Sequence, residues 1–423
     1  TNRNDNNDNN NKNILTLTND KITTVPLLMM DRRSAMMMAT ATTACATTWT
    51  QLPLSAEAAD VIISDTAIDI PTTIKDSITT STSTINNNQS PPIPSWTLEG
   101  DVRMPVMALN TAGLTLEGTE RALELAVQNG ITHVDFHPAR ERDGVAKYLE
   151  RLEITGSGGS GIGRSGTKRS DLFLTTKINI APKGISPVDA ANRVRDQIEE
   201  DLAILNVKNV DMLMLRDSPD AAVIQSQWLA LEEALQKGQT RAIGVINFCE
   251  FSLNSVLQTA KIKPAVNYYL THVGMGVDPK GLRSFGEARG IHTFAYGALG
   301  EPGPNKELLL DSPVVTQIAA SHNVSTAAVA LRWIVQSGAA VSVRPTKEFG
   351  LGTATCSAEK SASLSCNEGL HERATTFQWE LTNSEMKELT ALTSPTDNPT
   401  LFSSAGCPDA FGMKDMIKYM KSQ

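Results

Sequence analysis

The stretch VDMLMLRDSPDAAVIQSQWLALEEALQKGQTRAIGVIN (210–247) contains two apolar runs separated by one amphipathic helical pattern. Each run has the length of a strand that is buried on both faces, as the strands of a parallel sheet are. The helical pattern ends at Gly238, and glycine suits the left-handed position that follows a helix. The stretch therefore predicts a β-α-β unit with two parallel strands.

The same unit recurs along the chain. The predicted strands are 104–110, 132–136, 172–178, 210–216, 241–247, 264–269, 291–297 and 339–345. Amphipathic helical patterns lie between them, for example at 120–130 and 186–205. Eight strands that alternate with helices predict an α/β fold, a (β/α)8 TIM barrel. A doubly wound sheet fits less well, because ALNTAGL (108–114) is a poor match to its Gly-rich phosphate loop.

Polar residues gather at the carboxyl ends of the predicted strands, where such barrels carry their chemistry. They are Asn110, Thr111, Asp135, Lys177, Arg216, Asn247, Tyr268 and Tyr296. A polar residue at one strand end is ordinary, since the strand leaves the core there. Polar groups at seven ends exceed what packing needs, because each buried polar group must find a partner. The set predicts a functional site.

Composition excludes several classes of partner and site. The net charge of −8 disfavours a nucleic acid or an anionic membrane surface. No apolar run approaches the roughly 18 residues of a membrane helix, so we expect no integral membrane segment. The five cysteines are scattered without metal-binding spacing, and no metal is predicted. Cys356 and Cys366 share one insertion and would pair in an oxidising compartment; the alternative is free thiols.

Residues 1–97 form a low-complexity extension, rich in Asn, Thr and Ser, which predicts a largely disordered segment with a linker at 80–97. Within it, 29–58 contains Arg32-Arg33, an Ala/Met/Thr stretch and Ala56-Glu57-Ala58. This order resembles a twin-arginine export signal, which predicts the plastid thylakoid lumen or another exported compartment. The alternative is a chance arginine pair in a cytoplasmic protein.

Seven segments from Asp101 to Leu392 together resemble the aldo-keto reductase family. They are GITHVDF, LFLTTKI, VDMLMLRDSP, LEEALQKGQTRAIGVINF, KPAVNYY, RGIHTFAYGALG and FQWELTNSEMKEL. The resemblance implies reduction of a small-molecule carbonyl with NADPH or NADH. It also implies that Asp135 and Lys177 are the pair that lowers the pKa of a proton-donating Tyr, with a His to orient the carbonyl.

The Tyr and His of that group are not matched. Arg140 stands near the Tyr position, and Arg216 stands at the His position. His137 is the nearest group that titrates close to neutrality, which makes it a surrogate acid to consider. Arg140, Lys177 and Arg216 would place three positive charges around Asp135, and such a site would suit an anionic ligand. The alternative is that these cations form ordinary salt bridges to Asp135 and Asp217.

The resemblance also implies a cofactor site, in part altered. The residues expected to contact the cofactor are Thr111, Asn247, Tyr268, Tyr296, Leu299, Lys347 and Glu372. Among them, Tyr268 replaces the Gln usual in the family. Gly369 replaces the Arg that usually binds the 2′-phosphate, so the preference for NADPH over NADH should weaken.

We therefore expect a barrel at 98–395 and a C-terminal tail at 396–423 over its mouth, as a monomer. The first functional hypothesis is a nicotinamide-dependent reductase whose usual carbonyl reduction is impaired by the loss of Tyr and His. The second is a non-catalytic barrel that binds an anionic ligand or a protein partner. Export would favour the second hypothesis.

Overall fold

A computed structural model of the chain describes residues 92–156, 167–218, 220–300, 309–345, 356 and 360–392. The barrel expected at 98–395 falls largely within these ranges. The predicted export signal (29–58), most of the predicted linker (80–97) and the predicted tail (396–423) lie outside the described residues.

Eight parallel strands close into a barrel in the order β10-β3-β4-β5-β6-β7-β8-β9. They are β3 (Met107–Asn110), β4 (His133–Asp135), β5 (Phe173–Lys177), β6 (Val210–Arg216), β7 (Thr240–Ile246), β8 (Val266–Leu270), β9 (His292–Tyr296) and β10 (Ala340–Val343). Each overlaps one predicted strand. The structure confirms the predicted (β/α)8 TIM barrel.

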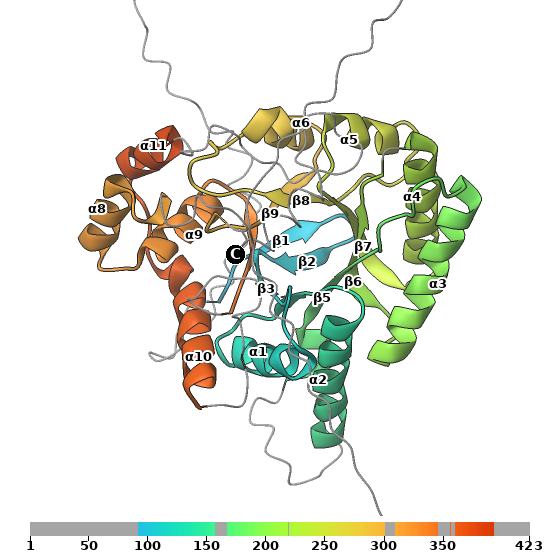
Figure 1. The fold of residues 1–423 in the computed structure, drawn as a ribbon, viewed down its shortest axis with the longest axis horizontal. Helices are drawn as coiled ribbons and strands as arrows, with labels where there is room; N and C mark the ends of the chain where they lie inside the picture. The colour runs from blue at the N-terminus through green and yellow to red at the C-terminus, as the bar shows by residue number, and fades with distance from the viewer. Residues whose placement is uncertain are drawn as a thin grey trace, which may run out of the picture. The chain divides into compact units, whose positions relative to one another are not determined.

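Helices surround the barrel on its outside (Figure 1). They are α1 (Leu116–Gln128), α2 (Arg140–Gly156), α3 (Pro187–Leu205), α4 (Ala221–Gln236), α5 (Glu250–Leu257), α6 (Leu282–Glu287), α8 (Pro313–His322), α9 (Thr326–Gln336), α10 (Lys360–Ala374) and α11 (Asn383–Ala391). Helix α3 begins as its sequence indicates, since Ser186 accepts a hydrogen bond from the backbone N–H of Asp189 and Pro187 follows it. Gly130 and Gly238 have the predicted positive φ, 81° and 70°.

A two-stranded antiparallel hairpin precedes the barrel. Its strands are β1 (Ser95–Leu98) and β2 (Val102–Pro105), joined by a turn with positive φ at Gly100 and Asp101. Figure 1 shows the hairpin over the middle of the barrel, and its side chains Trp96 and Met104 belong to the apolar cluster inside the barrel. No hairpin is predicted here from the sequence. The hairpin covers the amino-terminal end of the strands with apolar side chains.

The core has two layers. One cluster fills the space between the barrel and its helices, and a second cluster, which includes Phe173, Met212 and Phe294, fills the barrel interior. His133 is fully buried in this interior, where its ring nitrogens lie 2.9 Å from the Pro105 carbonyl oxygen and 2.8 Å from Thr175 Oγ1. Because these side chains fill the barrel interior, the polar cluster lies above them, at the carboxyl ends of the strands.

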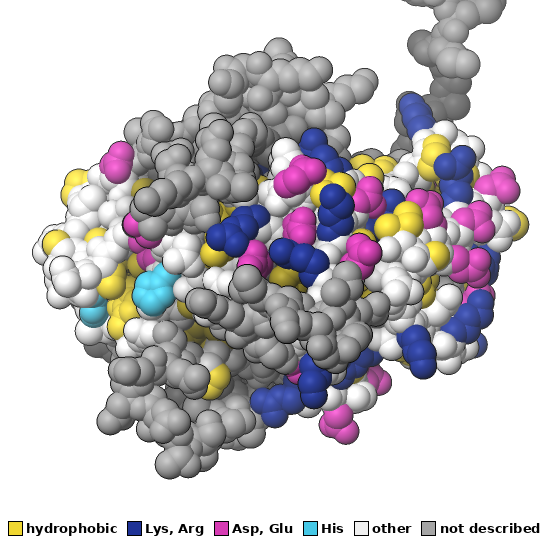
Figure 2. Space-filling model, turned by 90° about the horizontal axis from the view of Figure 1, so that it is seen from below, with side chains coloured by type: hydrophobic (Ala, Val, Ile, Leu, Met, Phe, Trp, Pro, Cys, Tyr) yellow, Lys and Arg dark blue, Asp and Glu magenta, His cyan; other side chains and the backbone are white. Residues whose placement is uncertain are grey.

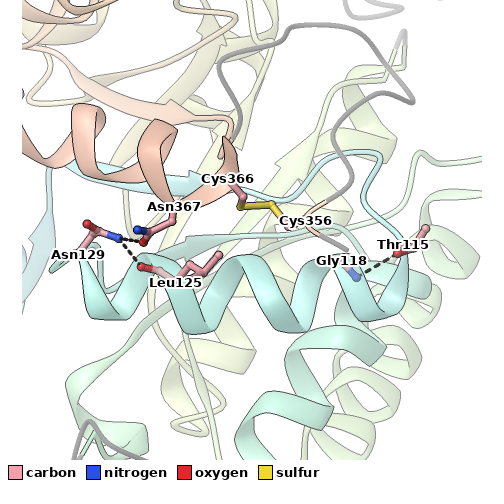
Figure 3. Close-up of a disulfide and its surroundings, with 7 residues drawn as sticks. All are labelled: Thr115, Gly118, Leu125, Asn129, Cys356, Cys366 and Asn367. Carbon is pink, nitrogen blue, oxygen red and sulfur yellow. Dashed lines mark hydrogen bonds between the residues drawn. A yellow bond between two sulfur atoms is a disulfide. The ribbon is translucent and has the colours of Figure 1, made fainter. Parts of the chain in front are cut away.

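Cys356 and Cys366 form a disulfide, with their Cα atoms 5.6 Å apart. Figure 3 shows it linking the segment before α10 to α10, beside α1. Next to it, Asn129 at the end of α1 donates a hydrogen bond to Asn367 of α10 over 3.0 Å. The pairing expected for an oxidising compartment is confirmed for these two cysteines, and the free-thiol alternative is wrong for them.

The charged residues on the face over α1 and α2 are mixed in sign (Figure 2). Arg121 pairs with Glu124 at 2.7 Å, and Arg151 pairs with Glu120 at 2.9 Å. The described residues of this face therefore form no extended field of one sign that would attract a polyanion. Among the described residues, no helix has the length and apolarity needed to cross a membrane.

Candidate active site

Asp135 is the centre of a buried polar cluster at the end of β4. Its Oδ2 accepts hydrogen bonds from Tyr268 Oη at 2.6 Å and from Ser342 Oγ at 2.7 Å. Its Oδ1 forms an ion pair with Lys177, and both side chains are fully buried. These four residues come from β4, β5, β8 and β10, so the closed barrel is what brings them together.

The charges of this pair are set by burial and by contact. Burial alone would raise the pKa of Asp135, but Lys177 and the hydrogen bonds hold it below its ordinary value. Burial lowers the pKa of Lys177, although Asp135 opposes this shift. The Lys177 ammonium also donates to the Phe136 carbonyl oxygen at 3.2 Å. Asp135 and Lys177 are together as predicted.

Tyr268, predicted to contact the cofactor, directs its hydroxyl at Asp135. Asn110 Nδ2 donates to this hydroxyl at 3.2 Å, and the ring packs against Phe294 and Tyr296. Burial and the neighbouring Asp135 raise the pKa of Tyr268 well above its ordinary value. A phenol whose proton is held by a carboxylate and whose pKa is raised is a poor acid, so Tyr268 does not replace the missing Tyr.

The two predicted arginines are not brought together. Arg140 is exposed at the first residue of α2, and its side chain makes no hydrogen bond or ion pair with the described residues. Arg216 lies at the end of β6, where burial lowers its pKa while Tyr296 and Tyr268 oppose that shift. Its guanidinium also makes no hydrogen bond within the described part of the chain. Of the ordinary salt bridges in the alternative, the structure shows the one between Lys177 and Asp135, and none from Arg216 within the described residues.

The residue after Arg140, Glu141, is the group that enters the site. Its carboxylate lies 2.9 Å from His137 Nδ1 and accepts the His137 backbone N–H at 3.0 Å. It also accepts the Gly113 backbone N–H at 2.9 Å and the Thr111 hydroxyl at 3.1 Å. Glu141 is not among the residues predicted from the sequence. His137 precedes α2 and Ala139 between them has a φ of 73°, so the spacing of four between His137 and Glu141 does not by itself indicate this contact.

Thr111 is part of the same hydrogen-bonded group as Glu141. Its side chain is fully buried, and its hydroxyl lies within hydrogen-bond distance of Glu141 and of the Asp135 carbonyl oxygen, at 3.2 Å. The hydroxyl is thus engaged with the protein at the position expected to contact the cofactor.

Asn247 and Tyr296 form the part of the site that fits a nicotinamide. Tyr296 Oη donates to Asn247 Oδ1 at 2.7 Å, which leaves the amide N–H groups to donate to a ligand carbonyl. The Tyr296 ring is partly exposed at the end of β9 and offers an aromatic face for stacking. Asn247 has a φ of 59°, a conformation that Asn tolerates and that is common at functional sites.

The other predicted cofactor contacts are less informative. Leu299 is buried at 5% exposure. Glu372 forms an ion pair with the neighbouring Arg373 on α10. Lys347 lies outside the described residues. The described residues contain no group of three or more His, Cys, Asp or Glu that could hold a metal ion.

A cavity of about 1010 Å³ lies at the opposite end of the barrel. It is lined by the β1–β2 hairpin and by residues at strand starts, among them Thr240, Arg241, Ala265 and His292. No predicted site residue lines it. The Asp135 cluster, at the carboxyl ends of the strands, is therefore separate from this cavity.

Comparison with known proteins agrees with this geometry. The sequence model of the aldo/keto reductase family matches residues 106–391, more than half of the chain. The chain is similar to NADPH-dependent codeinone reductase 1-4 of Papaver somniferum, with 28% identity over 326 residues, which cover 71% of this chain and 89% of that protein. It is similar to glyoxal reductase of Bacillus subtilis, with 30% identity over 276 residues, covering 65% and 83%.

Solved structures share the fold. An aldo/keto reductase from Brucella melitensis superposes with a TM-score of 0.55 and 22% identity, covering 70% of this chain and 98% of that one. The aldose reductase of Schistosoma japonicum superposes with a TM-score of 0.57 and 20% identity, covering 75% and 98%.

Proposed function

Because the chain belongs to the aldo/keto reductase family, we propose that its barrel binds NADP(H) and reduces small-molecule carbonyl compounds, with the family's usual proton transfer impaired. The proposed impairment of proton transfer rests on the residue at position 140. Arg140 is exposed where a proton-donating Tyr is expected, while the Asp135–Lys177 pair that would serve such a Tyr is intact. Removing a proton donor typically costs about 10²–10⁴-fold in rate.

The residues that would hold the nicotinamide end are Asn247 and Tyr296, through the amide N–H groups and the ring face. When bound, the cofactor supplies a hydride to the carbonyl carbon. Lys177, ion-paired with Asp135, is a fully buried cation whose Nζ lies 5.5 Å from the centre of the Tyr268 ring, which packs against Tyr296. A positive charge there favours an oxygen that becomes negative as the carbonyl is reduced.

Titration of the purified full chain with NADPH and NADH tests the proposal, followed by protein fluorescence and by melting temperature. We expect binding at micromolar strength and weaker binding in Asn247→Ala. The matched control is Asn129→Ala, which removes an amide at the end of α1, outside the site, and should leave the affinity unchanged. No binding of either cofactor at millimolar concentration would overturn the proposal.

A second candidate function is a non-catalytic barrel that binds an anionic ligand. Arg216 supports this function, because its partly buried guanidinium makes no hydrogen bond with the described residues. A guanidinium can bind a carboxylate through two parallel hydrogen bonds. Small dicarboxylates should then raise the melting temperature of the wild-type protein. Arg216→Gln should abolish this rise, whereas Arg140→Gln, at an exposed arginine, should retain it.

We propose, finally, that the protein works in an oxidising compartment. The buried Cys356–Cys366 disulfide supports this, since such bonds persist in exported and luminal proteins and are rare in the cytosol. The arginine pair within 29–58 agrees with export. Thiol labelling of protein taken directly from cells provides the test. Labelling of both cysteines without a reductant, after denaturation, would contradict the proposal.

A further inference from the structure

We propose that His137, held in place by Glu141, donates the proton to the carbonyl oxygen in this protein. The inference rests on the proposed reductase function and adds the group that performs the missing step. It also assigns Glu141 as a positioning residue, which acts through His137 and does not touch the substrate.

Glu141 is firmly held. Its carboxylate accepts hydrogen bonds from two backbone N–H groups, those of His137 and Gly113, and from the Thr111 hydroxyl. The remaining contact is His137 Nδ1, at 2.9 Å from Oε2. A carboxylate fixed in this way keeps the proton on Nδ1 and turns Nε2 away from itself. The arrangement is that of an oriented imidazole with one nitrogen left for chemistry.

His137 is also accessible to a ligand. Its side chain is 29% exposed, whereas Glu141 is 11% exposed and Lys177 is fully buried. Nε2 of His137 makes no hydrogen bond within the described part of the chain. A ligand at the carboxyl ends of the strands can therefore reach His137 without any displacement of the Asp135 cluster.

The neighbouring donors are unsuited to the step. The Tyr268 proton is held by Asp135, and an Arg such as Arg216 does not give up its proton near neutrality. Two further histidines are engaged elsewhere. His133 of β4 has both ring nitrogens bonded inside the barrel, and His272, two residues after β8, is buried with Nδ1 at 2.6 Å from the Val273 carbonyl oxygen. His137 is the one residue of this set that is accessible, oriented and able to change protonation in the ordinary pH range.

The proton balance is complete with these groups. As the carbonyl carbon gains hydride and its electron pair from reduced nicotinamide, the C=O π bond opens toward oxygen. The oxygen takes the proton from Nε2 of the His137 imidazolium, which becomes neutral imidazole and recovers a proton from water. In the reverse direction, neutral His137 accepts the alcohol proton.

The charges that face His137 set the pH at which it works. They are Asp135 on β4, Lys177 on β5, Arg216 on β6 and Glu141 on α2. Burial, Lys177 and Arg216 lower the pKa of His137, and Glu141 raises it, with a net shift below the ordinary value of 6.5. Carbonyl reduction should therefore become faster as the pH falls below about 6.5, and alcohol oxidation, which needs neutral His137, should become faster as the pH rises.

The first experiment needs no cofactor. Histidine-labelled full-length protein is titrated by NMR, and His137→Gln identifies the His137 signal among the six histidines. We expect a His137 pKa below 6.5 and a further decrease in Glu141→Gln, because the group that raises it is removed. A His137 pKa that does not respond to Glu141→Gln would overturn the positioning role.

The second experiment measures NADPH-dependent reduction of glyoxal against pH. His137→Gln should lower kcat by about 10²–10⁴-fold with unchanged NADPH affinity. Glu141→Gln should shift the pH profile in the same direction as the NMR pKa. The matched control is His322→Gln, which breaks another His–Glu pair, with Glu385 at 2.8 Å, on helices outside the site. It should leave both readouts unchanged.

The outcomes separate the two proposals. NADPH binding with wild-type turnover in His137→Gln overturns the donor role and leaves the reductase function standing. NADPH binding without turnover of glyoxal or any other carbonyl by wild-type protein also overturns the donor role. Absence of cofactor binding by wild-type protein overturns the reductase function, and the donor role with it.

Discussion

The hydroxyl of Tyr268 on β8 lies 2.6 Å from Oδ2 of Asp135 on β4, a strand on the opposite side of the closed barrel. This single bond crosses the barrel beneath the site. With Lys177 and Ser342 it satisfies both oxygens of a fully buried carboxylate, as a buried charge requires. These hydrogen bonds and the ion pair connect the carboxyl ends of four strands of the barrel beneath the candidate active site.

Tyr268→Phe tests whether this phenol is structural. The substitution removes one donor from Asp135 and leaves Asn110 without its acceptor, so the free energy of unfolding should fall by about 1.5–3 kcal/mol. Turnover should persist, because the phenol is not the acid. Urea denaturation and steady-state kinetics measure the two effects.

The matched control for Tyr268→Phe is Tyr269→Phe. Tyr269 is its neighbour on β8, also buried, and its hydroxyl bonds a neutral group, Thr293 Oγ1, at 2.9 Å. A neutral hydrogen bond contributes about 1 kcal/mol, so Tyr269→Phe should cost less. Equal costs for the two variants would contradict a charge-assisted bond to Asp135.

Lys177→Met tests the buried ion pair. Loss of one partner leaves Asp135 charged and uncompensated, and the free energy of unfolding should fall by about 3–5 kcal/mol. The double variant Lys177→Met/Asp135→Asn should cost clearly less than the sum of the two single variants. Additive costs, measured in the same denaturation series, would show that the pair is not coupled.

The barrel was predictable from sequence because each strand and helix has a local signature, an apolar run of strand length or a helical pattern such as those ending at Gly130 and Gly238. The β1–β2 hairpin was not predictable in this way. Its strands have four residues each and follow a low-complexity segment, and what fixes them is packing of Trp96 and Met104 into the barrel interior. That contact is visible only once the barrel is closed.

The site residues also differ in whether the sequence alone predicts their roles. Asp135 and Lys177 were found because each ends a strand in a recognisable segment. The roles of Tyr268 and Glu141 depend on which way their side chains point. Tyr268 reaches Asp135 across the barrel, and α2 begins so that Arg140 faces solvent while Glu141 faces inward. Neither direction follows from residue type or from spacing to a neighbouring motif alone.

The burial of His133 leads to a prediction of how the stability of the fold depends on pH. Its complete burial lowers its pKa from 6.5 to about 4. The unfolded chain therefore binds an extra proton between these values, so stability is full above 6.5 and falls as the pH decreases toward 4. The loss should be about 2–3 kcal/mol between pH 7 and pH 4.5.

Denaturation of wild-type protein and His133→Gln at both pH values tests this. The variant should start less stable at pH 7 and lose less on acidification. His371→Gln, at an exposed histidine, should follow the wild-type slope. The expectation fails if His133→Gln and wild-type protein lose the same free energy over this interval.

The Cys356–Cys366 disulfide should stabilise the fold through the unfolded chain. It closes a short loop, with a sequence separation of 10, and loops of this size contribute about 2–3 kcal/mol by restricting the unfolded ensemble. Cys356→Ala/Cys366→Ala should therefore lower the free energy of unfolding by that amount. Denaturation without reductant measures it.

Asn367→Ala is the control for that variant. Asn367 follows Cys366 on α10, and its exposed hydrogen bond with Asn129 is its contact with α1 seen in Figure 3. An exposed surface substitution of this kind should change the free energy of unfolding by no more than about 0.5 kcal/mol. If the double cysteine variant changes stability no more than Asn367→Ala does, the disulfide does not fasten α10, and its stabilising role is refuted.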